Sequence, residues 1–180
     1  MNMKIQTKTR TEQILMVMHI LAWVAFIGFM IEAGAILVSY GASVVNPDGA
    51  KNVYRGLNLY NLRQFNFWHY TLSVSFMVAL SIMKAFVSFL VIKTLSKFNL
   101  ANPFTMEVAR RLEKISYVAF GTWLVTMLSN AHTAWLMKIT GELHGNWISG
   151  EFIFMIGLVF IISQVFTRGV EIQSENDLTV

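Results

Sequence analysis

The sequence predicts an all-α integral membrane protein, built as a four-helix up-down bundle with both termini in the cytoplasm. The 180-residue chain is 55% hydrophobic and only 13% charged, whereas about a quarter of the residues of a soluble domain are charged. Its mean hydropathy is +0.54. Four apolar stretches each approach the roughly 20 residues with which a helix crosses a bilayer.

The composition also excludes several functional classes. A net charge of +4 is too small and too dispersed for a nucleic-acid-binding protein. The absence of cysteine excludes disulfide scaffolds, thiolate zinc sites and catalytic thiols. Because no internal repeat is visible, we expect residues 1–180 to form a single transmembrane domain.

The expected spans lie near residues 14–39, 70–92, 115–137 and 152–167. The first follows a positively charged segment, as the core of a signal peptide does. Its apolar run is roughly 25 residues, however, and a signal-peptide core has only about 7–15. We therefore expect a retained helix.

Positive charge sets the expected orientation. With the N-terminus inside, nine Lys and Arg residues fall in cytoplasmic segments and four in outer loops, as the positive-inside rule requires. Trp68, Trp135 and Trp147 then lie at the outer ends of the spans, where indoles prefer the headgroup level. The inner residues are Lys4, Lys8, Arg10, Lys93, Lys97, Arg110, Arg111, Lys114 and Arg168, and the outer ones are Lys51, Arg55, Arg63 and Lys138.

Two loops carry local signals. The long outer loop between the first two spans contains a turn signal at residues 46–49. Its alternating apolar residues between positions 57 and 67 predict a short strand or hairpin over the mouth of the bundle. In the inner loop, Asn102 is expected to cap the third helix and Pro103 to occupy its first turn. That helix then begins in the cytoplasm with a charged collar containing Arg110, Arg111 and Lys114, supported by i,i+3 and i,i+4 pairs.

Six polar residues fall inside the expected spans, where an ionisable group is costly without a partner. The helical rise places Glu32 and His132 at a similar depth, so we expect these two side chains to pair. Lys84 lies nearer the inner side, where it can extend to the headgroups or meet a carbonyl group or Gln164. Helix packing and a ligand or proton site both remain open for this set. Its members are His19, Glu32, Lys84, Asn130, His132 and Gln164.

Nothing in the sequence predicts a catalytic or metal centre. Of the four histidines, His69 and His144 are expected on outer loops, and His19 and His132 in opposite leaflets. A bis-histidine haem needs two imidazoles at one depth, so this placement disfavours one. No serine or threonine lies in a nucleophile motif. We therefore expect no catalytic residue, no metal and no cofactor.

The segment after the fourth span combines acidic and apolar residues. Arg168 is expected at the inner headgroups, and Glu171, Glu175 and Asp177 follow it. One interpretation is a solvated tail. The other is a docking strand that binds the charged collar or a cytoplasmic partner.

Two stretches resemble a known family. Asn102-Pro103-Phe104-Thr105, followed by an Arg-Leu helix, and the segment from Arg168 to Val180 are similar to domain-of-unknown-function family 2975. Its members are small four-helix bacterial membrane proteins, and Lys84-Ala85 is also similar to some of them. The resemblance implies a protein of the bacterial cytoplasmic membrane, often encoded beside a small helix-turn-helix regulator of the Cro/C1 type. It implies no established activity.

These features favour a non-enzymatic membrane sensor, or a regulatory partner of such a helix-turn-helix regulator. The alternative is a small permease or accessory transport subunit that uses Glu32, Lys84 and His132 along a polar path. The expected partners are the lipid bilayer and the regulator, without direct nucleic-acid binding, and a homo-oligomer is compatible with the sequence. A continuous hydrated path would favour transport, and a filled interior would favour regulation.

Overall fold

The computed structural model describes residues 9–97, 105–140 and 151–177. Within these ranges the chain is all-helical and contains no strand, which confirms the all-α part of the predicted fold class. The elements are four long helices, a short helix and a 3-10 helix. In chain order they are α1 (Arg10–Val45), η1 (Pro47–Lys51), α2 (Tyr60–Phe65), α3 (Phe67–Lys97), α4 (Met106–Thr140) and α5 (Glu151–Asp177).

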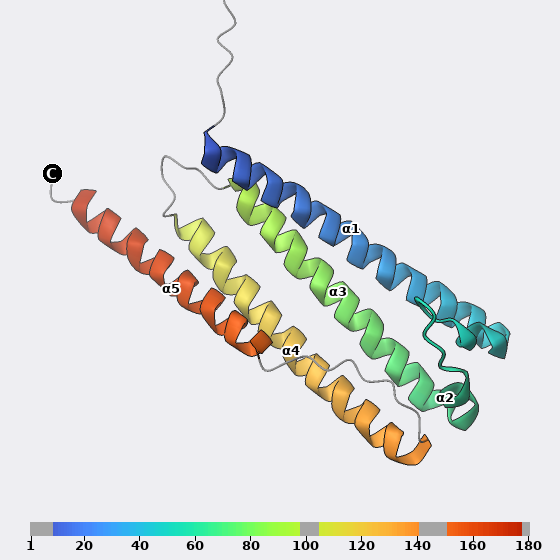
Figure 1. Ribbon diagram of the computed structural model, residues 1–180. Helices are drawn as coiled ribbons and strands as arrows, with labels where there is room; N and C mark the ends of the chain where they lie inside the picture. The colour runs from blue at the N-terminus through green and yellow to red at the C-terminus, as the bar shows by residue number, and fades with distance from the viewer. Residues whose placement is uncertain (1–8, 98–104, 141–150, 178–180) are drawn as a thin grey trace, which may run out of the picture.

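The long helices lie in an open row (Figure 1). Helix α1 packs on α3, α3 packs on α4, and α4 packs on α5. Neighbours in the row run in opposite directions, so α1 and α4 start at the end of the molecule where α3 and α5 finish. Elements η1 and α2 lie at the other end. As a result, α1 and α5 form the edges of the row, and α3 is covered on two sides.

In the described ranges, three helices are long and apolar enough to cross a membrane, judged by length and composition. They are α1, α3 and the stretch Ile153–Glu175 of α5. Large apolar side chains cover the outside of α1, where Ile31 is 63% exposed and Val38 is 74% exposed. A soluble monomer rarely exposes apolar surface so continuously. These three helices therefore have the composition of membrane spans.

The turn predicted at residues 46–49 is present directly after α1. The backbone N–H of Asn46 donates to the carbonyl of Ala42, and its side-chain oxygen accepts from the N–H of Asp48 at 3.0 Å. Asn46 thereby ends α1 and starts η1. Lys51 closes the turn with a 2.7 Å ion pair to Asp48, and the hydrogen bond and charge of Asp48 raise the pKa of Lys51.

The strand or hairpin predicted between positions 57 and 67 is wrong. Backbone groups of this loop bond within the loop, since Val53 donates to the carbonyl of Leu57 and Leu59 donates to that of Ala50. Leu59 and Leu62 are then three residues apart at α2, a helical spacing that buries both. They join a buried apolar cluster that fixes the loop over α1 and α3. Its members are Ile36, Ala50, Val53, Leu59, Leu62, Tyr70, Val74 and Leu136.

Candidate functional site

Two histidines meet between α3 and α4, at the end of the molecule that carries α2. The Nδ1 atom of His69 lies 3.3 Å from the Nε2 atom of His132, so one imidazole donates a hydrogen bond to the other. Trp135 and Phe76 enclose the pair, with ring centroids 5.0 Å from His69 and 6.0 Å from His132, respectively. The Nδ1 atom of His132 is buried and has no hydrogen-bond partner among the described residues. The pair therefore joins α3 to α4 and leaves one ring nitrogen able to form a further hydrogen bond.

This contact corrects two expectations. His69 lies in the first turn of α3, not on an outer loop, so two imidazoles do share one level. The expected pairing of Glu32 with His132 is wrong, because α1 and α4 flank α3 (Figure 1). In the described part of the chain, no hydrogen bond or ion pair joins Glu32 to His132.

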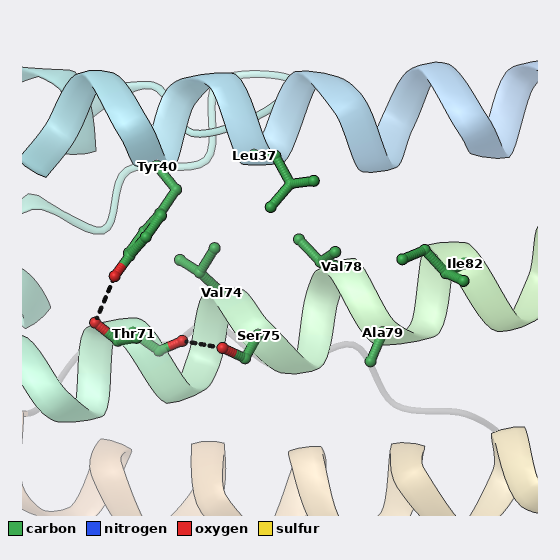
Figure 2. Close-up of a pocket in the computed structure, with 8 residues that line it drawn as sticks. All are labelled: Leu37, Tyr40, Thr71, Val74, Ser75, Val78, Ala79 and Ile82. Carbon is green, nitrogen blue, oxygen red and sulfur yellow. Dashed lines mark hydrogen bonds between the residues drawn. The ribbon is translucent and has the colours of Figure 1, made fainter.

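Near the histidine pair, hydrogen bonds among four hydroxyl side chains connect α1 to α3. The Ser43 hydroxyl donates to the carbonyl of Tyr40 at 2.7 Å, so the Tyr70 hydroxyl donates to Ser43, also at 2.7 Å. Thr71 donates to the carbonyl of Phe67 at 2.9 Å, and the Tyr40 hydroxyl therefore donates to Thr71 at 3.1 Å (Figure 2). Ser43 and Tyr70 are fully buried. These bonds fix α1 and α3 in register at the end of the molecule that carries α2.

An apolar groove runs from this group along α1 and α3. Figure 2 shows Leu37 and Tyr40 of α1 on one side, and residues of α3 on the other. The groove holds about 290 Å³. Apart from Tyr40, Thr71 and Ser75, its lining is aliphatic: Leu37, Val74, Val78, Ala79 and Ile82. Such a lining suits a hydrocarbon chain and not a polar solute.

Lys84 finds an aromatic partner on α1. Its Nζ atom lies 5.8 Å from the ring centroid of Phe29. It does not meet Gln164, because α5 packs on α4 and the Gln164 amide lies 3.5 Å from the hydroxyl of Ser163. Of the two expected ways to accommodate Lys84, the contact with Gln164 is therefore wrong.

The remaining polar residues of the expected spans are not brought together. His19 accepts a 3.2 Å hydrogen bond from the indole of Trp23, one turn along α1. Glu32 is half-buried on α1, and Asn130 is half-buried on α4. The set predicted from the sequence is thus distributed over several contacts.

Buried hydroxyl groups inside the row are satisfied within their own helices. Each donates to a carbonyl three or four residues earlier, which removes the cost of leaving it unpaired. These bonds therefore do not connect the histidine pair to Lys84. The donor and acceptor pairs are Ser81 to Met77, Ser88 to Lys84, Thr122 to Val118, Thr126 to Thr122, and Ser163 to Phe160.

The collar on α4 forms a hydrogen bond with α3. The Arg111 guanidinium donates to the carbonyl of Lys93 at 2.6 Å and pairs with Glu107 one turn earlier. Arg110 is exposed. Thr105 occupies the capping position, since its hydroxyl accepts from the N–H of Val108 at 3.3 Å. Asn102 and Pro103, which we expected there, lie outside the described residues.

The segment after the fourth expected span is helical. Helix α5 continues to Asp177, so the expected strand conformation is wrong up to that residue, and docking of this segment stays a prediction. Arg168 donates to Glu171 at 2.6 Å within the helix. The negative charge of Glu175 also attracts the Arg168 guanidinium. The side chain of Asp177 lies outside the described residues. The structure therefore presents this segment as an extension of α5.

The fold and the distribution of polar groups define an all-helical protein whose long apolar helices have the character of membrane spans. The chain belongs to the family described as "Protein of unknown function (DUF2975)", whose model matches residues 45–180. This confirms the resemblance found in the sequence. Comparison with curated proteins and with solved structures gave no match.

The histidine pair is expected to stabilise the contact of α3 with α4. Replacing His69 or His132 with alanine removes the same hydrogen bond, so the effects on the free energy of unfolding should be non-additive by more than about 0.5 kcal/mol. Thermal unfolding of both single variants and the double variant in detergent measures this coupling. Combining His69→Ala with His19→Ala, on α1, is the control and should be additive. Additivity in both cycles would contradict the contact.

Proposed function

We propose that the chain is a multi-pass protein of the bacterial cytoplasmic membrane, with spans near residues 14–39, 70–92, 115–137 and 152–167. The apolar character of α1, α3 and α5 supports three of these spans. The fourth is α4, which packs between α3 and α5 and is antiparallel to both (Figure 1). Both termini are then cytoplasmic, with α2 and the histidine pair on the outer side.

Cysteine accessibility tests this topology. The chain contains no cysteine, so Asn52→Cys and Ser174→Cys each introduce a unique thiol at an exposed position. In intact cells, we expect a membrane-impermeant maleimide to label position 52 and to label position 174 only after permeabilisation. Labelling of both positions in intact cells would contradict the proposed topology.

Within that topology, we propose a non-enzymatic sensor that controls a cytoplasmic helix-turn-helix regulator. One observation carries this proposal: the same two helices are joined by polar contacts near both ends. The outer contact is the pair of His69 and His132, and the inner one is the bond from Arg111 to Lys93. A signal that rearranges the outer contact can shift the balance between two arrangements of α3 and α4. The regulator then responds at the inner end.

The outer end also offers unsatisfied polar atoms to a signal molecule. Among the described residues, Arg63 Nε and His132 Nδ1 are buried without hydrogen-bond partners. Buried polar atoms of this kind are costly until a ligand or water pairs with them. Their position favours recognition on the outer side.

The alternative function, a small permease or accessory transport subunit, has less support. A polar path needs side chains that succeed one another across the membrane. Lys84 instead lies over an aromatic ring, and the groove between α1 and α3 is mostly aliphatic. Self-satisfied hydroxyl groups inside the row favour a filled interior.

Co-purification with a helix-turn-helix regulator of the kind that the family resemblance implies tests the sensor function. Deleting residues 171–180 removes the last turns of α5, and we expect capture of the regulator in mild detergent to be abolished while membrane insertion persists. The matched control is Lys51→Gln, which changes an exposed charge at the other end of the molecule. Full capture by the truncated chain would show that this segment is not the docking element.

A further inference from the structure

A basic and aromatic surface lies at the inner end of α3 and α4, away from the histidine pair. The Nζ atom of Lys93 lies 4.5 Å from the ring centroid of Phe89, and that of Lys114 lies 5.7 Å from the ring centroid of Phe86. Arg111 is held beside them by its bond to the carbonyl of Lys93. We call these five residues the inner basic surface.

The spacing of these residues makes one continuous surface from two helices. Phe86, Phe89 and Lys93 recur at intervals of three and four residues, which places them on one side of α3. Lys114 lies one turn after Arg111 on α4, so both cations reach the same side of α3. The surface therefore has a cationic part drawn from both helices and an aromatic part from α3.

The cationic part is not neutralised. Arg111 pairs with Glu107, but in the described ranges neither Lys93 nor Lys114 forms an ion pair with a carboxylate. Both lysines are exposed, and each ammonium instead lies over a ring. A cation over an aromatic ring keeps its charge and can still bind an anion.

We propose that the inner basic surface binds an anionic phospholipid, with the phosphate between Lys93 and Lys114 and an acyl chain against Phe86. Basic pockets between transmembrane helices on the cytoplasmic side recognise such headgroups. The apolar part favours a lipid over free phosphate, because Phe86 is 39% exposed and Ile82, one turn earlier, is 48% exposed. This inference rests on the proposed membrane topology but not on the proposed regulator.

Lipid titration of the full chain in nanodiscs tests the inference. Nanodiscs of phosphatidylcholine are prepared with increasing phosphatidylglycerol, and native mass spectrometry measures the phosphatidylglycerol that the protein retains. Each lysine near an anionic lipid surface contributes about fivefold to affinity. We therefore expect the double variant Lys93→Gln/Lys114→Gln to bind phosphatidylglycerol about 25-fold more weakly.

Two variants make the test specific. Lys51→Gln/Lys138→Gln removes the same charge at the other end of the molecule and should retain phosphatidylglycerol as the unmodified chain does. Lys93→Arg/Lys114→Arg keeps the charge and should retain most of the affinity. Unchanged affinity in Lys93→Gln/Lys114→Gln, or equal losses in that variant and the control, would overturn the lipid site alone. A chain that does not insert into the nanodiscs, with or without phosphatidylglycerol, would overturn the topology as well.

Discussion

Tyr70→Ala is expected to lower the free energy of unfolding by about 3–5 kcal/mol, the usual cost of truncating a buried aromatic side chain. The Tyr70 side chain is fully buried in the cluster over which the loop folds. Its ring stacks on Tyr40 with a centroid separation of 5.8 Å, and its hydroxyl is bonded to Ser43. Truncation therefore removes packing and a hydrogen bond between α1 and α3 together.

Thermal unfolding in detergent, with Tyr70→Phe and Trp68→Ala as comparisons, measures this effect. Tyr70→Phe removes only the hydroxyl and should cost about 1 kcal/mol. Trp68 lies two residues earlier and is 78% exposed, so Trp68→Ala should change the stability by less than about 0.5 kcal/mol. A loss in Tyr70→Ala no larger than that in Trp68→Ala would contradict the buried cluster.

Gly49→Ala is expected to destabilise the loop by about 1–3 kcal/mol, because overpacking displaces backbone. A Cβ atom at this position would lie 2.8 Å from the backbone nitrogen of Ser43 and 3.0 Å from the Cα atom of the same residue. Those atoms belong to α1 and cannot rotate away as a flexible side chain does. The loop would have to lift from the helix.

Gly34→Ala is the matched control for this substitution. Gly34 lies within α1, and a Cβ atom there meets nothing within 4 Å. Since glycine is a poor helix former, this variant should be as stable as the unmodified chain or more so. Limited proteolysis of the loop, together with thermal unfolding, distinguishes the two. Equal behaviour of both glycine variants would show that the loop does not pack closely on α1.

The long helices could be predicted from the sequence because each contains a long run of apolar residues, of about the length with which a helix crosses a bilayer. All four expected spans fall within observed helices, but each helix extends beyond its apolar stretch. Polar turns such as the one starting at Thr9 are helical because Thr9 and Glu12 cap one another, at 2.8 and 3.4 Å. Hydropathy alone does not detect such polar turns.

The short elements were harder to predict because alternating leucines fit two structures. Leu57 and Leu59 are two residues apart, as in a strand, while Leu59 and Leu62 have the spacing of a helix. Whether these leucines form a strand or a helix depends on their contacts with residues of α1 and α3, which lie elsewhere in the sequence. Tertiary packing therefore decides the structure of this loop.

The histidine pair was missed, although a local signal for it exists. The side-chain oxygen of Asn66 accepts hydrogen bonds from Trp68 at 2.8 Å and His69 at 3.3 Å. Asparagine is a preferred N-cap residue, so α3 could have been started at Phe67 and His69 placed inside it. Its partner His132 lies 63 residues away. That pairing required knowledge of which helices are neighbours.

The open row has a consequence for the order in which the chain assembles. Each long helix packs on the long helix that precedes it in the chain: α3 on α1, α4 on α3, and α5 on α4 (Figure 1). In the proposed membrane topology, each of α3, α4 and α5 therefore meets its preceding partner already in the bilayer during synthesis. After α1, no long helix has to search past an intervening one to reach that partner. Such contacts between consecutive long helices favour rapid folding, because little chain separates the packing partners.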